Sequence, residues 1–204
     1  MRKDKEKFFW RFTLGKKSLI KMKNEYYKEH LKGSEFYEAI VNCKNPYEKA
    51  IIGGEILNHQ STVLLKEYLN DECDAQIQNT INSLPFSSKI DLMLAFYFID
   101  KDHFIALKTI NDIRNIFAHF IQGLTFDTAE ISDEINKLTN LKLNQPDFYT
   151  RMEPEDKFSM IVTELYVYLF QQAFIVVKRK YIDKDPERID ASWERITPPK
   201  ENNV

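Results

Sequence analysis

Glycine and proline are scarce in this chain. Only 5 Gly and 7 Pro occur among its 204 residues, whereas folds built from many short strands use both residues freely in turns. The scarcity favours helices joined by few loops, and it excludes collagen-like and low-complexity proteins. With only 2 Cys, the chain is not a disulfide scaffold, and its length lets it bury enough surface to fold without cross-links.

Residues that bind metals or cofactors are equally few. Cys43 and Cys73 do not form a CxxC pair, and no HExxH, GxSxG, Walker or dinucleotide-binding motif occurs. The four histidines, His30, His59, His103 and His119, are widely spaced in the sequence. We therefore expect no metal site and no cofactor.

The chain shows no secretion signal and one candidate for a membrane span. Its first 20 residues carry too many charges for a signal peptide. The candidate span, Phe158–Val177, is strongly apolar but is interrupted by Glu164, Gln171 and Gln172. We expect a buried core helix and no membrane span. A cytoplasmic location, with both cysteines reduced, is the matching expectation.

Charge is distributed unevenly, although the net charge is only −2. Residues 1–32 contain 11 Lys and Arg against 4 Asp and Glu, and the remainder of the chain is acidic. Such a basic arm can bind an anionic partner or lie against its own acidic body. Its aromatic residues suit either an interfacial helix or packing against the domain. They are Phe8, Phe9, Trp10 and Phe12.

The pattern of apolar residues predicts an all-α protein with three parts. These are a basic N-terminal arm over residues 1–33, a single helical bundle of about five to seven helices over 34–182, and a tail over 183–204. Helices are expected over residues 45–70, 87–99, 102–121, 128–138 and 154–181. Ser87 or Ser88 is expected to cap the second of these, and a short extended piece is possible over 124–130.

The start of the helix over 45–70 has the clearest local signals. Asn45 can cap it, Pro46 suits the first helical position, and Glu48 is placed for a capping box. Within this helix, Gly53 and Gly54 each cost about 1 kcal/mol relative to Ala. Such a cost indicates that the backbone of a neighbouring helix approaches closely at this point.

The helix over 102–121 carries the residues best suited to chemistry. Asn115 and His119 lie about 40° apart around an ideal helix, whereas Arg114 lies about 140° from His119. Asn115 can therefore orient the imidazole. Arg114 reaches the same place only by its long side chain, by a helix distortion, or from a second subunit. A two-fold dimer that crossed here would bring two such sets into one cleft.

Arginine and histidine together suit RNA cleavage without a metal. Histidine moves protons near neutral pH, and arginine binds phosphate and stabilises the charge of the transition state. The nucleophile would be the ribose 2′-OH. The alternative is a solvated polar face on which His119 favourably ends the helix. Glu55 either orients the site from across the bundle or is simply an exposed carboxylate.

The segment from Arg114 to His119 resembles the Arg-x4-to-6-His motif of HEPN domains, including the polar residue after the arginine. HEPN domains are small helical proteins, often dimeric, and many are metal-independent ribonucleases of toxins and phage-defence systems. The resemblance implies that Arg114 binds phosphate, Asn115 assists it, and His119 is the general acid and base.

A longer stretch resembles the mannitol operon repressor (MtlR) family. The likeness is carried by Phe86–Ile99, Ile113–His119 and Phe126–Ile131, within residues 46–180. It implies an all-helical, dimeric regulator of transcription. Because no helix-turn-helix with a basic recognition helix is evident, such regulation would act through protein partners rather than by direct reading of DNA.

Three functions therefore remain open. A ribonuclease of the toxin or antiviral defence type would bring Arg114 and His119 together in a basic cleft. A non-enzymatic regulator would present an exposed apolar or acidic docking face and tolerate His119→Ala. An antitoxin or scaffold subunit would carry the motif without using it. The expected partners are a second copy of the chain, RNA, and an antitoxin or transcription regulator.

Overall fold

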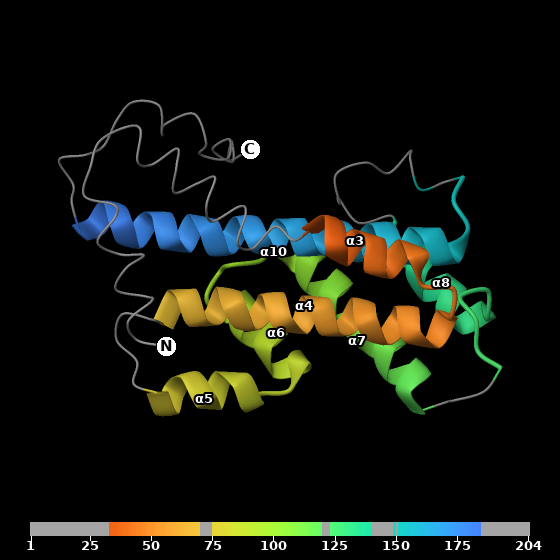
Figure 1. Cartoon of the computed structure of the whole chain (residues 1–204), viewed down its shortest axis with the longest axis horizontal. Coiled ribbons are helices and arrows are strands. Elements are labelled where there is room, and N and C mark those ends of the chain that lie inside the picture. The colour runs from red at the N-terminus through yellow and green to blue at the C-terminus, as the bar shows by residue number, and fades with distance from the viewer. Residues whose placement is uncertain (1–32, 70–74, 120–122, 140–148, 150, 185–204) are drawn as a thin grey trace.

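The computed structural model describes residues 33–69, 75–119, 123–139, 149 and 151–184. Over these residues the chain forms helices and no strand, which confirms the expected all-α bundle. The helices are α3 (Gly33–Asn42), α4 (Pro46–Leu69), α5 (Ala75–Ser83), α6 (Phe86–Ala95), α7 (Lys101–His119), α8 (Ala129–Leu138) and α10 (Pro154–Lys184) (Figure 1). Apart from Gly33 and the last two residues of α10, the predicted arm and tail lie outside the described residues, as does Cys73.

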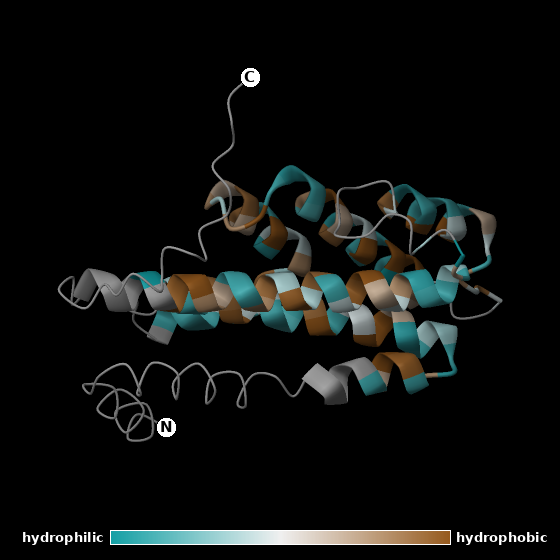
Figure 2. Cartoon of the chain, turned by 90° about the horizontal axis from the view of Figure 1, so that it is seen from above, coloured by the Kyte–Doolittle hydropathy of each residue, from teal (hydrophilic) through white to brown (hydrophobic). Residues whose placement is uncertain are grey.

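The two long helices α4 and α10 lie side by side along the molecule and form its largest helix–helix interface (Figures 1 and 2). They run in the same direction, because Lys49 near the start of α4 pairs with Glu155 near the start of α10. Gly53 then lies against the ring of Phe158. Since α4 also contacts α3, α5, α6 and α7, it is the central helix of the described bundle.

α6 and α7 form the antiparallel hairpin that their short connection predicts. The Nζ atom of Lys108 on α7 donates to Ser87 Oγ at 2.7 Å and pairs with Asp91 Oδ1 at 2.8 Å, both on α6. A turn over residues 96–100 joins the end of α6 to the start of α7, and these contacts bring α7 back along α6, so the two helices run in opposite directions.

The turn after α6 closes with a Schellman arrangement, in which the last carbonyls of the helix accept hydrogen bonds from the residues that follow it. The amide of Phe98 donates to Met93 O at 2.9 Å, and the amide of Tyr97 donates to Leu94 O at 3.0 Å. Tyr97 takes the left-handed conformation, with φ of 57°. This turn ends α6 at Ala95, so the helix predicted over 87–99 was too long.

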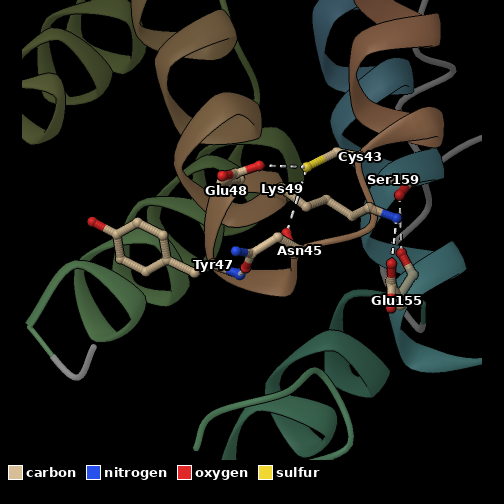
Figure 3. Close-up of polar contacts among 7 residues, drawn as sticks. All are labelled: Cys43, Asn45, Tyr47, Glu48, Lys49, Glu155 and Ser159. Carbon is tan, nitrogen blue, oxygen red and sulfur yellow. Dashed lines mark hydrogen bonds and ion pairs between the residues drawn. The ribbon is translucent and has the colours of Figure 1, made fainter. Parts of the chain in front are cut away.

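The start of α4 follows the prediction in part. Asn45 caps the helix, because its Oδ1 accepts the amide of Tyr47 at 3.0 Å. The side chain of Glu48 instead accepts a 3.8 Å hydrogen bond from the Cys43 thiol (Figure 3). Close by, Lys49 is buried and forms its ion pair with Glu155.

Two other local predictions were wrong. α6 begins at Phe86, directly after Pro85, and no side chain caps it, so neither Ser87 nor Ser88 has the expected role. The extended piece over 124–130 is absent from the described residues, where Thr128 instead precedes the first turn of α8.

The core is built from one apolar stripe on each of the main helices. Fully buried side chains include Leu57, Leu64, Ile90, Ile110, Ile113, Phe117, Phe158, Leu165 and Leu169.

The stretch Pro154–Val177 of α10 is long and apolar enough to cross a membrane, and 44% of its most apolar window of 18 residues is buried within the protein.

Candidate functional site

Arg114 emerges from α7 on the side that faces α4. Its aliphatic stem lies on Gly54, where an added Cβ would come within 2.6 Å of Arg114 Cγ and 3.0 Å of Arg114 Cβ. The glycine pair predicted a close backbone approach, whereas the atoms that lie nearest to Gly53 and Gly54 belong to side chains of α10 and α7. Only a glycine at position 54 lets the arginine lie flat across α4.

The guanidinium of Arg114 is held at both of its terminal nitrogens. Its Nη2 forms an ion pair with Glu55 Oε1, and its Nη1 donates to Asn115 Oδ1 at 3.0 Å. The side chains of Arg114 and Glu55 are 33% and 48% exposed. The group is thus fixed in orientation but reachable from solvent, as a binding site for an anion requires.

A buried lysine lies behind this ion pair. Glu55 Oε2 accepts a hydrogen bond from Asn58 Nδ2 at 3.3 Å, and Asn58 Oδ1 accepts one from Lys89 Nζ at 2.9 Å. Lys89 is only 3% exposed. Burial lowers the pKa of Lys89, the charge of Glu55 opposes that shift, and Lys66 adds to it. Asn58 therefore links the Glu55 carboxylate, which pairs with Arg114, to the buried ammonium of Lys89.

His119 stands apart from this cluster. It is the last residue of α7 and is exposed, and its side chain makes no hydrogen bond or ion pair to any residue that the structure describes. Asn115 directs its amide oxygen to Arg114, so it does not orient the imidazole within one chain. The structure brings Arg114, Asn115 and Glu55 together and leaves His119 on another face of the helix, as the ideal-helix angle of about 140° predicts.

Two members of the cluster, Asn58 and Lys89, were missed by reasoning from sequence. A signal was present for Lys89, because it lies three residues after Phe86 and four before Met93, on the apolar face of α6. A lysine at such a position must be buried or must reach past the core to solvent. A buried lysine is rare unless it has a partner, so the position indicates a polar contact in the core. Asn58 has no comparable signal, since exposed asparagines are common on helices.

A separate cluster around His103 lies at the other end of α7. Asp100 Oδ1 accepts the amide of His103 at 2.9 Å and contacts its Nδ1 at 2.8 Å, and the imidazole stacks on Tyr168 with ring centroids 3.5 Å apart. Burial raises the pKa of Asp100, but the hydrogen bonds from His103 outweigh it, so that pKa lies below its ordinary value. These contacts cap α7 and join it to α10.

No group of three or more potential metal ligands occurs among the described residues.

In comparisons with known proteins, no family model matches the chain, and neither a curated protein nor a solved structure matches it.

Proposed function

We propose that this protein is a metal-independent endoribonuclease of the HEPN type, with an active site completed by a second copy of the chain. The observation that carries the proposal is the guanidinium of Arg114, which Glu55 and Asn115 hold in place while a third of its side chain stays exposed. A fixed, reachable arginine can bind the phosphate of RNA and stabilise the charge of the transition state without a metal.

The second copy follows from the position of His119. Within one chain His119 and Arg114 lie on different faces of α7, and His119 is free to contact another molecule. We propose a two-fold contact along α7 in which His119 of one chain lies near Arg114 of the other, and the symmetry then forms this pairing twice. The dimer is part of the proposed mechanism.

The proposed reaction is an internal transfer at phosphorus. Arg114 binds the phosphate and offsets the charge that builds on its oxygens. The ribose 2′-oxygen bonds to phosphorus while the bond to the 5′-oxygen breaks. His119 takes the proton of the 2′-OH and delivers a proton to the departing 5′-oxygen. The products are a 2′,3′-cyclic phosphate and a free 5′-OH, with no net change in protons.

The test is cleavage of total RNA and tRNA in EDTA by the wild type, Arg114→Ala and His119→Ala. We expect cleavage by the wild type, with cyclic phosphate ends, and a loss of at least about 100-fold in each variant. The two inactive variants are then mixed. In a site shared between chains, mixed dimers contain one intact Arg114–His119 pair, so activity returns. Wild-type protein that forms dimers and leaves RNA intact would refute the proposal.

A second candidate is a non-enzymatic regulator of the mannitol-repressor type, and a separate observation favours it. Exposed aromatic side chains gather where α4 ends and α6 turns into α7: Tyr68 and Phe96 lie with ring centroids 5.2 Å apart, and Tyr97 is 94% exposed. Such a surface suits a protein partner. This candidate predicts that His119→Ala preserves function in the cell, whereas Tyr97→Asp abolishes it.

A further inference from the structure

We infer that Glu55 is a displaceable counter-ion, which occupies Arg114 until an RNA phosphate takes its place. This inference rests on the proposed function and names a residue that regulates access to the same site. The ion pair spans α4 and α7, and both side chains are partly exposed. A carboxylate and a phosphate seek the same donors on a guanidinium, so they compete.

The geometry leaves little room for both anions. Glu55 occupies Nη2 of Arg114, and Asn115 occupies Nη1. A phosphate that binds in the bidentate manner needs two neighbouring donors of the guanidinium, and Nη2 contributes to both of the usual pairs. An incoming phosphate therefore meets Glu55 directly, and like charges a few ångströms apart repel each other.

The structure also holds a place for the displaced carboxylate. Asn58 already donates to the second oxygen of Glu55, and Lys89 lies directly behind Asn58. The Lys89 ammonium has three donors and is nearly fully buried, yet it makes one hydrogen bond among the described residues. A carboxylate that leaves Arg114 moves toward an under-used buried cation, and this lowers the cost of the exchange.

The two states differ in one ion pair. With no RNA, Glu55 neutralises Arg114. With RNA, the phosphate neutralises Arg114, and Glu55 turns to Asn58 and Lys89. The positions of Glu55 and Lys89 thus determine the free-energy cost of the exchange, and therefore the affinity of the protein for RNA.

The test measures binding without cleavage. The full-length protein is titrated into a short fluorescent 2′-O-methyl oligoribonucleotide, which lacks the nucleophile, and anisotropy gives Kd. We expect Glu55→Gln to bind about fivefold more tightly, the gain that corresponds to the loss of one competing exposed ion pair. Glu130→Gln on α8, which removes an exposed carboxylate elsewhere, serves as the matched control and should change Kd much less.

A second variant moves Kd in the opposite direction. Lys89→Met keeps the volume of the buried side chain but removes the charge that receives Glu55, so affinity should fall. Lys101→Met removes an exposed lysine and controls for the loss of one positive charge. Because both Glu55→Gln and Lys89→Met are tested, misfolding of either one, seen by circular dichroism, does not remove the test.

The outcomes separate this inference from the proposed function. If the wild type cleaves RNA but Glu55→Gln binds no more tightly than Glu130→Gln, Glu55 only positions Arg114 and the displacement model is wrong. If the wild type does not cleave but Glu55→Gln gains affinity, and Arg114→Ala abolishes that gain, the displacement model stands and the ribonuclease fails. If no variant binds the oligonucleotide, the displacement model is overturned, and the ribonuclease is overturned with it only when the wild type also leaves total RNA and tRNA intact.

Discussion

At the scale of single residues, the most informative position is one that lacks a side chain. Gly54 lies inside α4, where Ala would normally add about 1 kcal/mol of helix stability. The stem of Arg114 fills the space that a methyl group would need. The atoms in the way are Cγ and Cβ: Cγ moves only by a side-chain rotation that would carry the guanidinium away from Glu55 and Asn115, and Cβ moves only with the backbone of α7.

We therefore predict that Gly54→Ala destabilises the protein by about 1–3 kcal/mol, the usual range for overpacking. Urea unfolding followed by circular dichroism measures the change. In an Arg114→Ala background most of the obstructing stem is gone, so the same substitution should cost clearly less. An equal cost in both backgrounds would show that Arg114 is not the obstacle.

At the scale of elements, the α6–α7 turn has an unusual choice of residue. A left-handed residue that ends a Schellman turn is usually glycine, because a Cβ clashes in that conformation. Here the residue is Tyr97, whose side chain is 94% exposed and so gains little from burial. The fold thus carries a local strain that its own packing does not offset.

Replacing Tyr97 with glycine should stabilise the protein by about 1 kcal/mol, the approximate cost of the left-handed conformation for other residues. Thermal unfolding would show a higher Tm. Tyr97→Ala is the control, because it removes the same exposed side chain but keeps the Cβ, and its Tm should stay close to that of the wild type.

The same turn shows what could be predicted about the elements. The scarcity of Gly and Pro indicated helices, and Asn45 and Pro46 marked the start of α4 correctly. The end of α6 was misplaced because the apolar run continues through Phe96 and Phe98, and no glycine marks the turn. For the site, the angle of about 140° between Arg114 and His119 around an ideal helix already predicted that they lie on different faces. Its contacts with Glu55 depend on how α7 packs on α4, which no local pattern encodes.

At the scale of the whole molecule, the α4–α10 interface contains one buried charge. Lys49 has a side chain that is 4% exposed, and its partner Glu155 is 38% exposed (Figure 3). Removal of the glutamate leaves an uncompensated ammonium in the interface. Removal of the lysine leaves a carboxylate that water can still reach.

We predict an asymmetric result from this pair. Glu155→Ala should lower the free energy of unfolding by about 2 kcal/mol, less than for a fully buried pair because Glu155 is partly hydrated. Lys49→Met should change it by less than about 1 kcal/mol, since the apolar side chain fills the same space. Denaturant titrations at neutral pH compare the two, and equal losses would contradict the assignment of the buried charge.

The central position of α4 also determines how the molecule opens. Fluctuations that release α3, α5 or α8 leave α4 covered by α6, α7 and α10, so local fraying does not expose its middle turns. The amide protons around Leu57 and Leu64 should therefore exchange with solvent only when the entire domain unfolds. Their exchange rates in deuterium oxide then report the global stability of the protein, while the amides of the outer helices report smaller, independent openings.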